Sequence, residues 1–246
     1  MSRIAALFRP RQKAPESDRR PLEAALRTLP GARIAVQSLN GASVGRIAFE
    51  ADSIKGGMAA HAGWLVALDG AILNAADLAK GGHDNSDHAA LLASLLASLG
   101  PQATLERIEG DFATAAYDAA NDRLWLLRDR LGVKPLYWAA IDGGFACASQ
   151  PRALVGLPGV SGEPDRGFVG RFAGMHYRTF DNAPERSPYR DINQVPAASY
   201  VELSAKGAVL RRYWELHPQP DLSGSEDELA DRYRTLLSEA LKAPKK

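Results

Sequence analysis

Four short strand-like segments follow one another between residues 112 and 150, and they constrain the fold more than any other feature of the sequence. They are FATAAYD (112–118), RLWLLRD (123–129), LYWAAID (136–142) and GFACASQ (144–150). Asn121-Asp122 and Gly143-Gly144 supply turns between them. We expect these segments to be strands of antiparallel sheets.

Further strands and helices flank this region. We expect a strand over 2–9, a helix opened by Pro21, strands over 32–39 and 42–49 joined at Asn40-Gly41, and a strand pair over 63–73 turning at Asp69-Gly70. We also expect three helices, from Ser86-Asp87 to Gly100-Pro101, over 104–108 and over 228–241. A hairpin is expected at Lys206-Gly207, and irregular structure over 156–196. Strands, then helices, then strands again indicate an α+β fold with antiparallel sheets.

Composition excludes several classes of function. The 246 residues carry a formal net charge of +1, too little to attract nucleic acid or a membrane surface. No apolar run approaches the roughly 18–20 residues of a membrane span. The apolar stretch after Met1 is too short for a secretory signal. We therefore expect a cytoplasmic protein with no nucleic-acid partner and no membrane partner.

The sequence also predicts no metal centre. Its five histidines stand in neither H-x-x-x-H nor H-x-E spacing, and one cysteine permits neither a multi-cysteine zinc site nor an internal disulfide. Cys147 lies in the apolar run FACAS, where we expect a small buried side chain rather than a nucleophile. The segment LSGSEDE (222–228) superficially resembles a phosphate-binding loop, but no strand precedes it, so we expect an acidic helix start.

Several motifs resemble those of one family. EGDFATAAYD, RDRLGVKPLYW and FACASQPRAL are similar to the patterns GxFAFAxxD, RDRxGxKPLYY and FASExKAL. These patterns are typical of the glutaminase domain of asparagine synthetase and related class II amidotransferases, which have an N-terminal nucleophile. RYWEL (212–216) resembles the end of that domain, and DELADRYRTLLSEAL resembles the first helix of the ATP-dependent synthetase domain.

The resemblance implies an αββα sandwich, in which two antiparallel sheets lie between helices. It implies a glutaminase-like domain over residues 1–217, and a linker with the first helix of a synthetase domain over residues 218–246. The expected partner is the rest of that synthetase domain, which would hold ATP and magnesium. We expect no cofactor within the 246 residues of this chain.

The catalytic residues of the family are replaced here. Its members begin Met-Cys-Gly-Ile, and the cysteine thiol attacks glutamine once methionine is removed. This chain begins Met1-Ser2-Arg3-Ile4, so Ser2 stands at the nucleophile position. An N-terminal serine is able to attack, because the α-amino group titrates near pH 8 and accepts its proton. A hydroxyl is nevertheless much less acidic than a thiol. Arg3 is expected to add a charge to the same pocket.

The position that stabilises the oxyanion is also altered. The family motif N-G-E-I-Y-N offers an Asn side chain and a Gly N–H group to the developing negative oxygen, and here the motif is DGAILN, starting at Asp69-Gly70. An ionised Asp69 is only an acceptor and would repel the oxyanion. Ala71 replaces a glutamate that holds the substrate amino group in the family.

One substrate-binding position is retained, and a second is matched over a shorter spacing. Asn85-Ser86-Asp87 matches G-S-D, whose Asp contacts the substrate α-amino group, although Asp87 would equally suit a helix cap. Arg46 matches the arginine that binds the substrate carboxylate.

The resemblance therefore leads us to expect a degenerate glutaminase domain in an ATP-dependent amide-forming enzyme. Lasso peptide cyclases, our first choice, and β-lactam synthetase are relatives of this kind, and they need no ammonia. Two alternatives stay open. One is an active hydrolase, either a glutamine-hydrolysing asparagine synthetase domain or a serine-type amidohydrolase. The other is a scaffold that docks on the synthetase domain or on a precursor peptide or its processing protein.

Overall fold

A computed structural model describes residues 3–27, 33–48, 56–82, 87–157, 159–175, 183–218 and 223–242. The chain divides into two compact units, Met1–Trp214 and Glu215–Lys246. Among the described residues, the first unit contains two sheets and the second contains one helix.

The first sheet has six antiparallel strands in the order β10-β8-β9-β1-β3-β2. Their bounds are β1 Arg3–Phe8, β2 Arg33–Leu39, β3 Ala42–Ala48, β8 Tyr137–Ile141, β9 Gly144–Ala148 and β10 Asn193–Gln194. The N-terminal strand β1 lies between β3 and β9, so the start of the chain is inside the sheet rather than at its edge.

The second sheet also has six antiparallel strands, in the order β12-β11-β7-β6-β5-β4. Their bounds are β4 Gly57–His61, β5 Trp64–Ile72, β6 Gly110–Asp118, β7 Arg123–Arg128, β11 Ser199–Ser204 and β12 Gly207–Arg212. Four hairpins of the sequence analysis are confirmed: β2–β3, β6–β7, β8–β9 and β11–β12.

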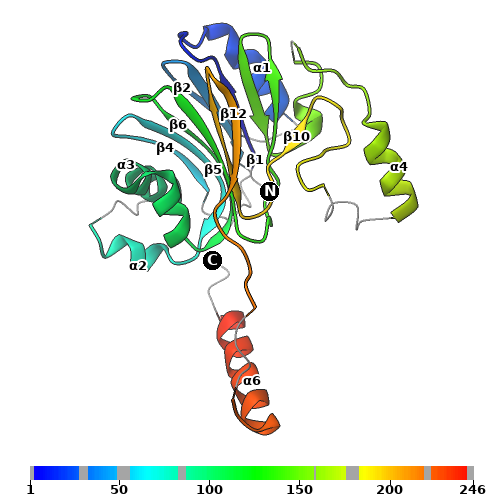
Figure 1. The fold of residues 1–246 in the computed structure, drawn as a ribbon. Helices are drawn as coiled ribbons and strands as arrows, with labels where there is room; N and C mark the ends of the chain where they lie inside the picture. Colours follow the sequence, from blue (N-terminus) through cyan, green and yellow to red (C-terminus); the bar gives the residue numbers. More distant parts are fainter. Residues whose placement is uncertain are drawn as a thin grey trace. The chain divides into compact units, whose positions relative to one another are not determined.

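Side chains alternate between the two faces of each sheet and form three buried layers. Ile4, Ala6 and Phe8 of β1 face the second sheet and pack against Leu65 and Ala67 of β5. The outer face of the first sheet packs on helix α1 (Arg19–Leu26), and that of the second sheet packs on helix α3 (His88–Arg107). Figure 1 shows helix α3 beside strands β4 and β5 of the second sheet. The order helix, sheet, sheet, helix confirms the predicted αββα sandwich.

One predicted hairpin is wrong. Asp69-Gly70 was expected to turn a strand pair over 63–73, but β5 runs straight through both residues, and its hairpin partner is the preceding β4. Gly70 has a φ of +119°, and a Cβ there would lie 1.9 Å from the carbonyl oxygen of Asp111. Glycine is needed here because β6 approaches closely, not because the chain turns.

The expectation of irregular structure over 156–196 is also partly wrong. Helix α4 (Arg166–Met175) and strand β10 lie within it. Asp165 accepts the N–H of Phe168 at 2.9 Å and so caps the start of α4. Three glycines in this ten-residue helix lower its propensity and concealed it in the sequence.

Helix α3 runs across the predicted stop at Gly100-Pro101, but Gly100 has a φ of +77°, so two helical pieces meet there. The two helices expected in this region are therefore present as a kinked pair. A short helix, α2 (Ala75–Ala79), and two 3₁₀ turns, η1 (Glu16–Asp18) and η2 (Pro151–Ala153), complete the first unit.

The second unit contains helix α6 (Glu226–Lys242), which confirms the helix expected over 228–241. Ser225 and Glu228 cap it reciprocally: the Ser225 N–H donates to Glu228 Oε2 at 2.8 Å, and the Glu228 N–H donates to Ser225 Oγ at 3.3 Å. This local cap confirms the acidic helix start expected there. In the part of the chain that the structure describes, no helix is long and apolar enough to cross a membrane.

Candidate functional site

The start of β1 is held by its two neighbours. In the β1–β3 pair Ile4 lies opposite Arg46. On the other side the Ile4 N–H donates to Ser149 Oγ at 3.0 Å, and the Ser149 N–H donates to the Ile4 carbonyl at 3.0 Å. Ser2, the predicted nucleophile position, lies outside the described residues. Arg46 and Ser149 therefore flank Ile4 on its two sides within the first sheet.

Asp69 lies on the inner face of β5 and is 3% exposed. Its carboxylate makes an ion pair with Lys134, the Nζ lying 3.4 Å from Oδ1. Ser149 Oγ donates to Asp69 Oδ2 at 3.4 Å. Because Ser149 also binds Ile4, the carboxylate is connected to the start of β1 through one hydroxyl group. The Asp69 carboxylate thus points toward the start of β1.

A tight turn after β7 positions Lys134. The Asp129 carboxylate accepts three backbone N–H groups, from Leu131, Val133 and Lys134, at 2.9 to 3.1 Å. Arg128 is also buried and donates to the carbonyls of Gly132, Lys134 and Val195. Its burial lowers the pKa of the guanidinium from the ordinary value. The charged turn seen in the sequence is therefore a rigid support that carries Lys134 to Asp69.

Arg46 and Gly70 both lie close to Gly56. A Cβ at Gly56 would lie 3.3 Å from Arg46 Nη2 and 3.3 Å from the Gly70 backbone nitrogen. The guanidinium is thus near the N–H group that the resemblance assigns to oxyanion binding. Its predicted role in binding a substrate carboxylate stays a prediction.

Asp87 caps helix α3, its Oδ1 accepting the N–H of Ala90 at 2.7 Å. Its other oxygen is close to β4, because a Cβ at Gly57 would lie 3.1 Å from Oδ2. Gly57 pairs with Leu68, next to Asp69. The capping role left open by the sequence is therefore observed, and substrate binding by Asp87 stays a prediction.

The structure thus gathers four predicted site residues, Asp69, Gly70, Arg46 and Asp87, around one end of β5. Sequence reasoning missed three contributors: Lys134, Ser149 and His88. Lys134 was visible as part of the charged turn, but its reach to Asp69 needs the packing of two sheets. His88 Nδ1 accepts the Ile72 N–H at 2.9 Å, so this imidazole holds the end of β5.

Arg3 does not share this site. It follows the outer alternation of β1, with Ala5 and Leu7, and it lines a cavity beside Pro21 and Ala25 of α1. The expectation that Arg3 adds a charge to the nucleophile pocket is therefore wrong. A strand turns successive side chains to opposite faces, and the sequence comparison ignored that alternation.

Cys147 is buried between the sheets, and burial raises the pKa of its thiol to about 12. A protonated, enclosed thiol is not a nucleophile, which agrees with the sequence interpretation. Among the described residues no group of three or more His, Cys, Asp or Glu side chains is arranged to hold a metal ion.

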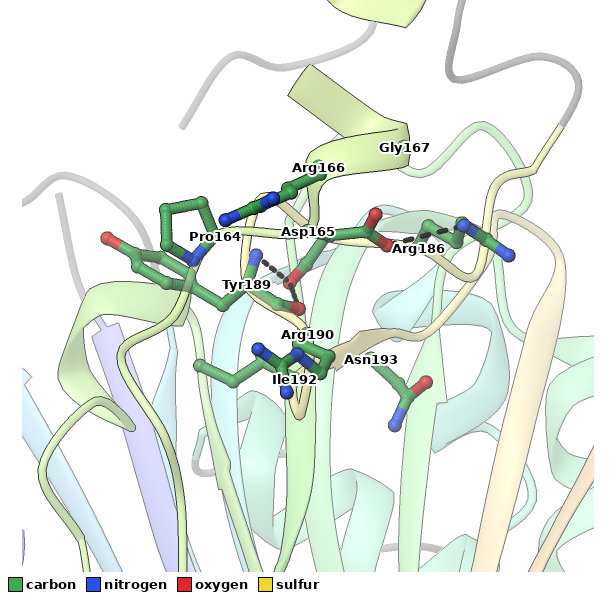
Figure 2. A pocket seen from close by; sticks show the side chains of 10 residues that line it. Pro164, Asp165, Arg166, Gly167, Arg186, Tyr189, Arg190, Ile192 and Asn193 are labelled. Carbon is green, nitrogen blue, oxygen red and sulfur yellow. Dashed lines mark hydrogen bonds and ion pairs between the residues drawn. The ribbon is translucent and has the colours of Figure 1, made fainter. Parts of the chain in front are cut away.

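A separate cavity of about 600 Å³ lies at the start of α4. Figure 2 shows Asp165 facing Arg186, with Arg166 and Arg190 on opposite sides of the hollow. Arg186 pairs with Asp165 at 3.3 Å, and Arg190 pairs with Glu163. Carboxylates therefore offset the positive charge of this cavity.

Comparison with known proteins gives the family. A family model described as a glutamine amidotransferase domain matches residues 57–214. A glutamine-hydrolyzing asparagine synthetase of Bacillus subtilis is 26% identical over 141 residues, covering 56% of this chain and 22% of that protein. A putative glutamine-hydrolyzing asparagine synthetase of Mycobacterium bovis is 29% identical over 113 residues, covering 45% of this chain and 17% of that protein. The matches thus span about a fifth of the length of these relatives.

A solved structure shows the same fold. Glutamine phosphoribosylpyrophosphate amidotransferase from B. subtilis, complexed with ADP and GMP, superposes with a TM-score of 0.54 at 14% identity. The superposition covers 87% of this chain and 49% of that one. Since the matched family segment makes up more than half of the chain, the protein belongs to the class II glutamine amidotransferase family, as an asparagine synthetase-like domain.

Proposed function

We propose that this domain has lost glutamine hydrolysis and serves as the N-terminal part of an ATP-dependent amide-forming enzyme. One observation carries the proposal: a buried carboxylate, Asp69, occupies the position from which the family donates a hydrogen bond to the oxyanion. Lys134 and Ser149 hold it toward the start of β1. Loss of one such donor slows acyl transfer by about 10²–10³, and the negative charge adds repulsion.

The proposed nucleophile adds to this loss. Ser2 offers a hydroxyl in place of a thiol, and a hydroxyl attacks an amide less readily unless the oxyanion is well stabilised. The changes at Ser2 and Asp69 reinforce one another, because a hydroxyl nucleophile depends more than a thiol on stabilisation of the oxyanion, and Asp69 alters the position that would provide it.

Such a loss is harmless in an enzyme whose substrate supplies its own amine. In the proposed reaction a substrate carboxylate attacks the α-phosphate of ATP, forming an acyl adenylate and releasing pyrophosphate. An amine of the same substrate then displaces AMP and forms the amide. We place this reaction in a synthetase domain that binds ATP and magnesium, in the cytoplasm. A lasso peptide cyclase, which closes a macrolactam, is our first choice, and a β-lactam synthetase-like ligase is the second.

Glutaminase measurements on the full chain test the loss. We expect wild type, Ser2→Ala and Ser2→Cys all to release ammonia from glutamine at the background rate. The cysteine variant is decisive, because it restores the thiol but leaves Asp69 in place. Activity in Ser2→Cys alone would show that Asp69 is no barrier, and wild-type activity abolished by Ser2→Ala would overturn the proposal. The N-terminal mass must first show removal of Met1.

A second candidate function is a serine-type amidohydrolase, and the Lys134 ammonium favours it. A cation beside the oxyanion position would stabilise negative charge if Asp69 turned aside. Incubation with the glutamine analogue 6-diazo-5-oxo-L-norleucine separates the two functions. The amidohydrolase predicts a covalent adduct at Ser2, and the degenerate domain predicts an unmodified chain.

The synthetase reaction is tested on the full-length protein that contains this domain. A peptide with a free amine and a side-chain carboxylate is incubated with ATP, and its mass is measured. Amide formation predicts a loss of one water together with one AMP and one pyrophosphate per product. Asparagine formation from aspartate and glutamine would contradict the proposal.

A further inference from the structure

A second cavity lies on the outer face of the first sheet, remote from the face that carries Asp69. It has a volume of about 700 Å³ and is bounded by α1, the start of β1 and the segment that follows β9. We call it the α1 pocket. Its volume is within the usual range of ligand-binding cavities and is much larger than the volume of a single small anion.

Three arginines line the α1 pocket: Arg3, Arg27 and Arg152. In the part of the chain that the structure describes, none of their side chains has a hydrogen bond or an ion pair, and no Asp or Glu lines the cavity. Three guanidinium groups that line one hollow give it a positive potential, which favours an anionic ligand. The cavity at the start of α4 is different, since its arginines Arg186 and Arg190 have carboxylate partners.

One residue of the pocket replaces an acid of the family pattern. The motif FASExKAL has Glu where this chain has Gln150, and Gln150 lines the cavity. The next matched position is basic in both, Lys in the pattern and Arg152 here. The lining of the pocket therefore has a cation at Arg152 and no carboxylate at Gln150.

The rest of the lining is apolar. It includes Pro21, Ala24 and Ala25 from α1, together with Val155 and Leu157. A bare phosphate would pair with the guanidinium groups but would leave this surface in water. A peptide with carboxylate and aliphatic side chains would cover both, because arginine binds carboxylates in a bidentate manner.

We infer that the α1 pocket binds an acidic peptide segment, with Arg3, Arg27 and Arg152 holding its carboxylates. The inference does not depend on the loss of glutaminase activity, because the pocket and the Asp69 site lie on opposite faces of the first sheet.

Fluorescence anisotropy of a labelled twelve-residue peptide of alternating Glu and Leu tests this inference on the full chain. We expect saturable binding that weakens with added salt and that is absent for the matching Gln-Leu peptide. The double variant Arg27→Gln/Arg152→Gln should weaken binding at least tenfold. Both side chains are exposed, so we expect the variant to fold, which circular dichroism checks.

A matched control removes two other exposed arginines, in Arg107→Gln/Arg211→Gln, with the same change of net charge. Binding within about twofold of wild type supports the inference. Equal loss in both double variants, equal binding of both peptides, or no binding by wild type would overturn it. Complete displacement of the peptide by millimolar inorganic phosphate would also overturn it, since it would indicate a small-anion site.

Discussion

Two buried aspartates of this domain differ in how their charge is satisfied. Asp129 is 1% exposed and accepts three backbone N–H groups of its own turn. Asp69 is 3% exposed, and side chains from other parts of the chain, Lys134 and Ser149, bind it. Backbone N–H groups are already ordered by folding, so binding them costs Asp129 little additional conformational entropy. The long side chain of Lys134, in contrast, loses conformational entropy when it is held in the ion pair with Asp69. Asp129 therefore stabilises the fold of its turn, whereas Asp69 is a charged group within the candidate site.

Lys134 connects the two aspartates. Its backbone N–H donates to Asp129 Oδ2 at 3.0 Å, and its ammonium lies 3.4 Å from Asp69 Oδ1. The turn therefore fixes the residue that pairs with Asp69. If the comparison is correct, changes at Asp129 should affect the whole fold, and changes at Asp69 should depend on Lys134.

The largest effect is expected for Asp129→Ala. It leaves three partly buried N–H groups, of Leu131, Val133 and Lys134, without their acceptor, and hydrogen bonds to a charged group contribute about 1.5–3 kcal/mol each. We expect the free energy of unfolding to fall by about 3–5 kcal/mol, measured by urea denaturation. Asp111→Ala, at an exposed position of β6, is the control and should change it by less than about 0.5 kcal/mol. A small effect at Asp129 would remove the distinction between the two carboxylates.

A smaller effect is expected from breaking the Asp69–Lys134 pair. Lys134→Met removes the ammonium that pairs with the buried Asp69 carboxylate, and Asp69→Asn removes the negative charge that pairs with the ammonium. Each single change should lower the free energy of unfolding by about 1–3 kcal/mol. The double variant should be more stable than the sum of the two changes implies, with a coupling of at least about 1 kcal/mol in a double-mutant cycle. Additive effects would show that Asp69 does not depend on Lys134.

The layers of the fold were predictable from local patterns. The Asn40-Gly41 hairpin and the closely spaced strands after residue 110 each depend on residues near in sequence, and both are confirmed. Asp69-Gly70 misled because the same dipeptide suits a hairpin turn and a straight strand with a close neighbour. Only the position of the Asp111 carbonyl distinguishes the two, and that position depends on the pairing of β5 with β6.

The site was predictable only in part. Resemblance located Asp69, Gly70, Arg46 and Asp87, which the structure brings near one end of β5. It did not find Lys134 as the partner of Asp69, because 65 positions separate them in sequence and the contact joins the β7 turn to β5.

Ser149→Ala should have the smallest effect of the three predicted changes. It tests the contribution of the uncharged partner of Asp69. The change removes the acceptor of the Ile4 N–H and the weak contact to Asp69 Oδ2 at 3.4 Å. We expect the free energy of unfolding to fall by about 1–2 kcal/mol, mostly from the buried N–H group. The Ile4 amide should then exchange faster with deuterated solvent, while amides of the Asp129 turn stay protected. Repeating the change in an Asp69→Asn background isolates the carboxylate contact. An equal loss in both backgrounds would show that Ser149 supports β1 alone and contributes nothing to holding Asp69 in the site.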